Sequence, residues 1–387
     1  MSGIVLSAAV RQNLLSLQNT AELLSSTQNR LASGKKVNTA LDNPTNFFTA
    51  QGLDNRASDI NNLLDGIGNG VQVLQAANTG LTSLQQLVDT AKSIANQVLQ
   101  TTTGYTAKST ATSTALPVGS TAANLVDGTA IKSGETLAIA ATGGGTATSF
   151  TFGATTTLAQ LNTALAANNL TASLDSSNDL ILTTTNDVAS STIGAITLGA
   201  AGTATFAAPV APTPDPNSQA TRASLVTQYN NIITQITTTS QDASFNGINL
   251  LNGDDLKLTF NETGKSTLTV TGVTYDAAGL GLSTLTPGTD FRDNSSANAV
   301  IAKVTAASDQ LRSEASALGS NLSIVQIRQN FAKNLINVLQ TGSANLTLAD
   351  TNEEAANSQA LSTRQSIAVS ALALSNQSQQ SVLQLLR

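Results

Sequence analysis

Apolar residues recur at alternating steps of three and four near both ends of the chain. In the N-terminal stretch they form a heptad seam, interrupted only at Gln28: Val10, Leu14, Leu17, Ala21, Leu24 and Leu31. Between residues 361 and 387 they cover more than one face of a helix: Leu361, Ile367, Ala368, Val369, Ala371, Leu372, Leu374, Val382, Leu383, Leu385 and Leu386. A helix that is apolar on several faces must be surrounded. We therefore expect the two ends to pair, and the pair to pack against other copies of the chain.

The first half of the chain predicts two long helices. The first covers 4–32 and ends near Gly34, and Pro44 opens the second after a connector. The second helix covers 45–100, and its seam shifts phase after Leu81. The seam residues are Leu53, Ala57, Ile60, Leu64, Ile67, Val71, Leu74 and Leu81, followed by Leu84, Leu87, Ala91, Ile94 and Val98.

Three glycines lie inside this second helical pattern. Their spacing matches neither phosphate-binding glycine motif, although a phosphate-cradling loop is conceivable. We favour close helix packing for them instead: Gly66, Gly68 and Gly70.

Composition changes abruptly at Thr101, where a Thr/Ala/Gly/Ser-rich segment without arginine begins and continues to residue 216. Short alternating runs predict strands, and Leu158 to Ala167 predicts a helix between the second and the third. The runs are 136–140, 149–152, 170–174 and 180–182. Four prolines predict a stiff linker at its end: Pro209, Pro212, Pro214 and Pro216.

Helical pattern returns at 217–240, and 255–275 predicts a β-hairpin. A long helix follows over 296–340, with Gly342 separating it from a terminal helix that begins near Asp350. The fold class is therefore mainly α with a β insert. We expect elongated nested domains: terminal helices forming coiled-coil inner and middle layers, a β-hairpin in the middle layer and a small β-rich outer domain. The expected domains are 1–44 with 345–387, 45–104 with 217–344, and 105–216.

Composition narrows the function. Charged residues make up 11% of the chain, well below the roughly 25% of typical proteins, and such a surface repels its own copies weakly. An ordinary secreted protein with a Thr/Ala-rich surface is the alternative. A net charge of −6 gives no basis for nucleic-acid binding, and no apolar run approaches the ~20 residues of a membrane span. The N-terminus lacks the pattern of a cleaved secretory signal.

The chain contains no cysteine and no histidine. Disulfides are therefore excluded, and so are the commonest metal ligand and the commonest general base. A carboxylate pair could still perform acid–base catalysis, but we expect the acidic residues of the insert to be solvated turn residues: Asp127, Glu135, Asp175, Asp179 and Asp187. We assign no catalytic, cofactor-binding or metal-binding residue and expect no cofactor.

Three segments resemble signatures of bacterial flagellins. The N-terminal one runs from Leu31 to Pro44, the internal one from Ser244 to Gly253, and the C-terminal one comprises 376–378 with the ending 382–387. The matching positions that we single out are Gly34, Asn38, Asp42, Pro44, Phe245, Gly247, Leu250, Leu251, Asn376 and Gln377. The resemblance covers roughly 1–100 and 220–387.

The resemblance implies a structural subunit of the flagellar filament, the helical propeller of swimming motility. The terminal helices would form an inner tube, the next helices and the hairpin an outer tube, and the insert would face solvent. Polymerisation would depend on apolar terminal residues: Val10, Leu14, Leu17, Leu24, Leu31, Ile367, Leu372, Leu374, Leu383 and Leu386. Implied partners are other copies, the filament cap, hook-associated junction proteins and a cytoplasmic export chaperone for the C-terminal helix. The protein would be extracellular, exported through the flagellar type III channel.

Two alternatives and one departure accompany this resemblance. An insert carrying a zinc protease would need an H-E-x-x-H motif, which a chain without histidine lacks. A junction protein or surface adhesin could share the terminal helices. Where many flagellins carry an arginine that animal innate receptors recognise, this chain has Gln86.

Overall fold

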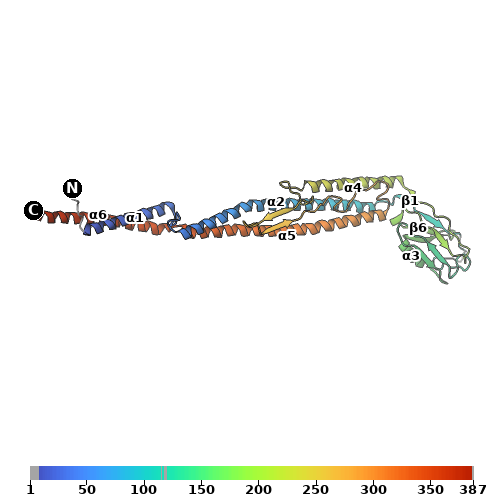
Figure 1. The fold of residues 1–387 in the computed structure, drawn as a ribbon. Helices are drawn as coiled ribbons and strands as arrows, with labels where there is room; N and C mark the ends of the chain where they lie inside the picture. The colour runs from blue at the N-terminus through green and yellow to red at the C-terminus, as the bar shows by residue number, and fades with distance from the viewer. Residues whose placement is uncertain (1–7, 115, 117–119, 386–387) are drawn as a thin grey trace. The chain divides into compact units, whose positions relative to one another are not determined.

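The computed structural model describes residues 8–114, 116 and 120–385 (Figure 1). The chain forms two compact units. Unit 1 is drawn from Met1–Gly70, Lys257–Leu268 and Ile324–Arg387. Unit 2 is drawn from Val71–Leu256 and Thr269–Ser323. The division passes through two long helices, so each unit is described by itself.

Five long helices account for most of the described chain, and all were expected. They are α1 (Ala8–Ser33), α2 (Pro44–Gln100), α4 (Pro216–Asp242), α5 (Asn294–Thr347) and α6 (Thr351–Leu385). The predicted boundaries at Gly34 and Pro44 are confirmed. Gly34 has φ +69°, a conformation that favours glycine after a helix end, and Pro44 is the first residue of α2.

The predicted break at Gly342 is wrong, because α5 continues to Thr347. A glycine inside a helix costs only about 1 kcal/mol relative to alanine. Packing of α5 against α2 offsets this cost: a Cβ at residue 342 would stand 3.4 Å from Leu53 Cδ1. The helix ends just before the short segment in which Leu348 pairs with Lys35.

The core of unit 1 lies between α2 and α5. Ala57 and Ile60 of α2 pack with Ala332, Ile336 and Leu339 of α5, and Leu53, Leu64 and Leu335 lie at the edge of this cluster. The α2 positions follow the seam predicted for that helix.

The three glycines of α2 do not serve helix packing as predicted. A Cβ at Gly70 would lie 2.4 Å from Leu258 Cδ2, so Gly70 makes room for a strand of the hairpin. Gly68 faces only the Gln329 side chain, at 3.9 Å, and Gly66 has no neighbour within 4 Å. The hairpin itself is confirmed: β9 (Leu256–Thr259) pairs with β10 (Thr267–Val270).

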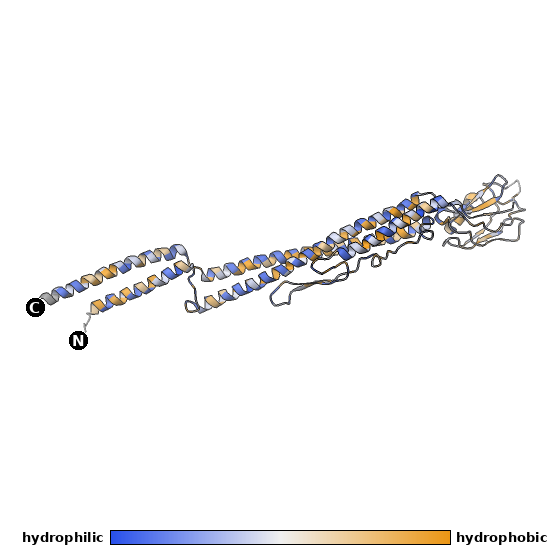
Figure 2. Cartoon of the chain, turned by 90° about the horizontal axis from the view of Figure 1, so that it is seen from above, coloured by the Kyte–Doolittle hydropathy of each residue, from blue (hydrophilic) through white to orange (hydrophobic). Residues whose placement is uncertain are grey.

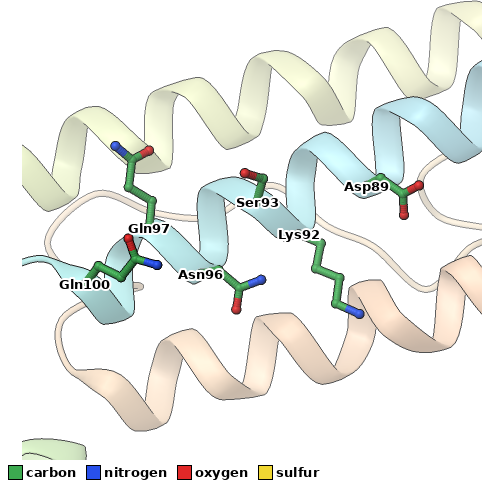
Figure 3. Close-up of a pocket in the computed structure, with 6 residues that line it drawn as sticks. All are labelled: Asp89, Lys92, Ser93, Asn96, Gln97 and Gln100. Carbon is green, nitrogen blue, oxygen red and sulfur yellow. The ribbon is translucent and has the colours of Figure 1, made fainter.

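The helical part of unit 2 is a three-helix arrangement in which α2 runs between α4 and α5 (Figure 3). Adjacent residues of α2, such as Val73 and Leu74, are both buried because the helix is covered on more than one face. Tyr229 of α4 is 1% exposed and stacks edge-on with Phe291, with 6.0 Å between ring centroids. Burial raises the pKa of Tyr229 to about 12.

The insert is part of unit 2 and contains the predicted strands and helix. Its elements are β1 (Tyr105–Ala107), β2 (Thr110–Thr112), β3 (Thr136–Ile139), β4 (Thr148–Thr151), α3 (Leu158–Leu165), β5 (Leu170–Leu174), β6 (Leu180–Thr184), β7 (Ile196–Leu198) and β8 (Thr213–Pro214), with 3₁₀ turns at Ala166–Asn168 and Asn186–Val188. Two antiparallel sheets, β2-β6-β5 and β4-β3-β7, enclose an apolar core with Leu137, Phe152 and Leu161. The insert therefore has a core of its own.

Two sequence expectations for the insert are wrong. The proline segment, predicted as a stiff linker, is instead paired with the insert: Pro214 pairs with Tyr105, and Val210 N–H donates to Thr110 O over 2.8 Å. Glu135 is not a solvated turn residue, since it is 2% exposed. Its carboxylate accepts hydrogen bonds from the backbone N–H groups of Lys132 and Gly202, at 3.1 and 3.2 Å. In both cases at least one partner lies far away in the sequence: Tyr105 for Pro214, and Gly202 for Glu135.

Candidate polymerisation interface

In unit 1, α1 packs along α6, as expected for the two ends of the chain. The less exposed positions of both helices follow alternating steps of three and four, the spacing of a coiled-coil seam. On α1 they are Val10, Asn13, Leu17, Thr20, Leu24 and Thr27. On α6 they are Glu354, Ser358, Leu361, Gln365, Ala368, Leu372 and Ser375. Polar residues occupy half or more of this seam, so the pair alone buries little apolar surface.

The seam on α1 differs from the predicted one at every second position. Val10, Leu17 and Leu24 face α6, but Leu14 and Leu31 are 37% and 38% exposed. The centre of the contact is shifted by about 50° around the helix, so that Asn13, Thr20 and Thr27 face α6 in place of Leu14, Ala21 and Gln28. The apolar stripe of α1 therefore continues past the edge of the contact.

The C-terminal helix shows the same excess of apolar surface. Leu372 lies in the seam, whereas Ile367 and Leu374 are 64% and 69% exposed. The Leu383 side chain and all of Leu386 lie outside the described residues. Figure 2 shows hydrophobic residues interspersed with hydrophilic ones along both terminal helices.

A short antiparallel bridge fixes the inner end of this helix pair. Ala349 N–H donates to Gly34 O over 3.0 Å, and Lys36 N–H donates to Thr347 O over 2.8 Å. Arg30 and Glu354 form an ion pair of 3.4 Å beside it. These contacts connect the C-terminal end of α1 to the N-terminal end of α6.

The N-terminal signature residues build the turn into α2. The Asp42 carboxylate accepts hydrogen bonds from the backbone N–H groups of Asn38 and Thr39, both at 2.9 Å. The bonds from Thr39 and then Asn38 hold the pKa of Asp42 below its ordinary value. The Asn43 side chain accepts from Asn46 N–H over 3.0 Å and caps the first turn of α2. In the structure these residues fix a local backbone conformation.

The internal signature forms a tight turn and a helix cap in unit 2. Gly247 has φ +80° in the turn that pairs Phe245 with Ile248. Leu250 and Leu251 are buried, while Phe245 is 36% exposed. The sequence did not predict that this segment also caps α4. The side-chain amide of Asn249 donates to Ser240 O and Gln241 O, at 2.8 and 2.9 Å. These are carbonyls of the last turn of α4, which would otherwise lack donors.

The C-terminal signature residues Asn376 and Gln377 are exposed on α6. Gln86 is exposed on α2, in unit 2.

Exposed apolar side chains are concentrated in unit 1. Among the described residues, fourteen of the seventeen large apolar side chains that remain exposed belong to unit 1, and only Val210, Phe245 and Val273 belong to unit 2. By contrast, an open depression of about 510 Å³ on α2 of unit 2 has a polar lining (Figure 3). Its residues are Asp89, Lys92, Ser93, Asn96, Gln97 and Gln100.

Other kinds of site find no support in the described part of the chain. It holds no group of three or more acidic residues arranged as metal ligands. None of its helices combines the length and the apolar character needed to cross a membrane.

Comparisons with known proteins agree with the arrangement of the terminal helices. Residues 5–137 match the bacterial flagellin N-terminal helical region, and residues 301–386 match the bacterial flagellin C-terminal helical region. Flagellin FljM of Caulobacter vibrioides is 33% identical over 165 residues, which are 42% of this chain and 59% of that protein. Flagellin FljK of the same organism is 32% identical over the same shares. Flagellin A of Rhizobium meliloti is 37% identical over 90 residues, or 23% of each chain.

The chain thus spans about 59% of the length of the Caulobacter relatives. The N-terminal match includes α1 and the C-terminal match includes α6, the two helices that pair in unit 1. Together with the turn and cap signatures, they establish that the chain belongs to the bacterial flagellin family.

Proposed function

We propose that this chain is a structural subunit that polymerises into the flagellar filament, the helical propeller of bacterial swimming. The observation that carries the proposal is the exposed apolar surface of the terminal helix pair, with Ile367, Val369 and Leu374 each more than half exposed. Chains of this family are structural, and no catalytic function is proposed.

Burial between copies provides the driving force. Covering one such side chain contributes roughly 1.5–3 kcal/mol, while association costs roughly 4–15 kcal/mol in lost freedom. A handful of apolar side chains per contact therefore suffices. Because the seam between α1 and α6 is half polar, the helix pair has little stability of its own until other copies cover its exposed apolar side chains.

The proposal assigns one layer to each nested part. Residues 1–44 and 345–387 form an inner tube, 45–104 and 217–344 form an outer tube, and 105–216 faces solvent. The filament is extracellular, and the subunit reaches it by type III export. A cap, hook-associated junction proteins and a cytoplasmic chaperone for α6 are its further partners.

Seeded polymerisation at neutral pH tests the proposal by electron microscopy. The full chain is compared with a variant that lacks 1–30 and 361–387. All three tyrosines lie in unit 2 and the chain has no tryptophan, so tyrosine fluorescence verifies that unit 2 of the variant is still folded.

We expect filaments from the full chain alone. Filaments from the truncated variant would show that polymerisation does not require the terminal helices. A full chain that stays a monomer, with unit 2 folded, would contradict the polymer and favour a junction protein or adhesin.

A further inference from the structure

Phe291, shortly before the start of α5, has a φ of +57° and therefore lies in the left-handed region. The other described non-glycine residues with a positive φ are Asn169, Asn178 and Asn246, and asparagine tolerates this conformation far better than a bulky residue does. A strained backbone of this kind persists only where the surrounding contacts hold it in place. We call residues 291–293 the joint.

Two contacts hold Phe291 against the helical part of unit 2. Its ring is 0% exposed and packs edge-on against Tyr229 of α4. Its carbonyl oxygen accepts a hydrogen bond of 2.9 Å from Nη1 of Arg222. The same guanidinium donates from Nε and Nη2 to the carbonyl oxygen of Thr102, at 3.3 and 3.2 Å, and Thr102 lies between α2 and β1. One buried cation therefore connects the joint to the segment that enters the insert.

Asp293 of the joint connects α5 with a loop of the insert, and it is 7% exposed. Its Oδ1 accepts a hydrogen bond from Ser296 N–H over 3.0 Å and caps α5. Its Oδ2 accepts from the Ser190 hydroxyl over 2.5 Å, and Ser190 follows the 3₁₀ turn Asn186–Val188 of the insert. Burial lowers the pKa of the nearby Arg222 guanidinium, and the Asp293 carboxylate opposes this change. The two buried groups therefore stabilise one another in the charged form.

The remaining residue of the joint contacts β1. The Arg292 side chain donates from Nε and Nη2 to the Tyr105 hydroxyl oxygen, at 3.4 and 3.3 Å. Tyr105 pairs with Pro214 of β8, so the two chain crossings between the helices and the insert run side by side. Two adjacent crossings by themselves form a hinge about which the insert could turn. The bond from Ser190 to Asp293 attaches a third segment of the insert, and this third attachment opposes such a motion.

We propose that the joint holds the insert in one orientation on the helices of unit 2, with Asp293 as a positioning residue and the Ser190 hydroxyl as its partner. The insert has an apolar core of its own, so opening the joint releases its orientation and leaves it folded. The inference concerns the single chain and does not require polymerisation. In the proposed filament, a fixed insert would present the same surface on every subunit.

Distances between two spin labels test the joint directly, because the natural chain has no cysteine that would interfere. The labels are attached in a parent chain that carries Thr163→Cys and Ser93→Cys, at exposed positions of α3 and of α2 (Figure 3). Pulsed electron paramagnetic resonance then gives the distribution of label distances in dilute, unseeded chains. We expect one narrow peak from this labelled parent.

Opening the joint should broaden the peak. Ser190→Ala combined with Tyr105→Phe removes both hydroxyl partners, and loss of the hydrogen bond to the charged Asp293 should shift the ratio of attached to detached insert roughly tenfold. Ser190→Thr keeps the hydroxyl and should keep the peak narrow. Ser177→Ala, at an exposed position in a different turn of the insert, should also leave it narrow. Far-UV circular dichroism verifies that each variant is folded.

A broad distribution from the labelled parent would overturn the proposal, and so would a narrow one from the double substitution. Broadening by Ser190→Thr as large as that by Ser190→Ala would show that the hydroxyl is not the attachment. If the double substitution fails to fold, Ser190→Ala alone gives the same comparison. Filament assembly does not enter this measurement, so the joint and the proposed function can fail separately.

Discussion

Unit 1 and unit 2 differ in where their large apolar side chains lie: unit 2 buries most of them, whereas unit 1 exposes many. Of the twelve largest fully buried side chains among the described residues, ten lie in unit 2, and Ile60 and Ile67 lie in unit 1. Unit 1 instead carries fourteen of the seventeen exposed large apolar side chains in that part of the chain. Unit 2 is thus complete within one chain, whereas unit 1 leaves much of its apolar surface uncovered.

The difference follows from how many elements surround each helix. In unit 2, α2 runs between α4 and α5, and the insert has two sheets and a helix around its own core. In unit 1, α1 and α6 have one another, and their common seam is half polar. A two-helix contact covers only one stripe of each helix. We infer that substitutions in unit 1 act mainly on assembly and those in unit 2 mainly on folding.

The largest expected effect is on assembly. Leu374→Asp should abolish filaments, because it puts a charge where the proposed contact buries a side chain that is 69% exposed in the single chain. Sedimentation of seeded samples measures polymer mass, and tyrosine fluorescence should show unit 2 melting at an unchanged temperature. Val210→Asp is the matched control in unit 2. Normal filaments from Leu374→Asp would contradict the inference that exposed apolar side chains of unit 1 act in assembly.

Next in size is a core substitution in unit 2. Leu74 is 0% exposed, and its replacement by alanine should destabilise unit 2 by about 2–5 kcal/mol. Thermal unfolding followed by tyrosine fluorescence measures the loss. Leu15→Ala, at a position that is 60% exposed in unit 1, should leave that transition where it is. Equal shifts for both variants would show that the units do not fold independently.

A smaller effect is expected for a buried polar group. Arg222 is 1% exposed, and its guanidinium donates to Phe291 O at 2.9 Å and to Thr102 O at 3.2 and 3.3 Å. Arg222→Met should cost about 1–3 kcal/mol, because buried carbonyls lose their donors. Urea unfolding of unit 2 measures this cost. The exposed Arg312, paired with Asp309 on the same helix, provides a control in Arg312→Met, expected to change stability by less than about 0.5 kcal/mol.

The smallest effect concerns acidification of unit 1. The pKa of Asp42 lies below its ordinary value of 3.8. The stabilisation that its carboxylate gives the loop is therefore fully present above about that pH and is lost as the pH falls through the folded-state pKa. An NMR titration should place the midpoint of Asp42 below 3.8, with the amide signals of Asn38 and Thr39 changing in parallel. A midpoint at or above 3.8 would contradict this coupling, and Asp42→Asn should remove it.

Local signals predicted the ends and types of most elements. Pro44 and Gly34 fixed a helix start and a helix end through properties of single residues. Alternation predicted β3, β4, β5 and β6 of the insert but not its other strands, and the heptad pattern predicted that α1 and α6 pair. The signature segments identified the family before any contact was known. The polymerisation residues and the three-part domain division stay predictions.

Predictions failed where the outcome depended on distant partners. Gly342 looked like a helix end, but α2 packs beside it and α5 continues. Gly70 proved to serve the hairpin through Leu258. Glu135 looked like a surface residue, yet backbone donors from its own turn and from Gly202 keep it buried. The distant neighbours, Leu53, Leu258 and Gly202, cannot be inferred from local spacing.

Sequence pattern and signature residues were thus enough to predict which segments are helical or extended, where several of them begin and end, and which family the chain resembles. Those properties depend on backbone preference and side-chain period, which short stretches carry. Three-dimensional packing was needed to show that Asn13 rather than Leu14 faces α6, that Leu41 is exposed in its loop and that α5 keeps uncovered apolar side chains. Burial is a property of whatever packs against a residue, and here much of that comes from the far end of the chain.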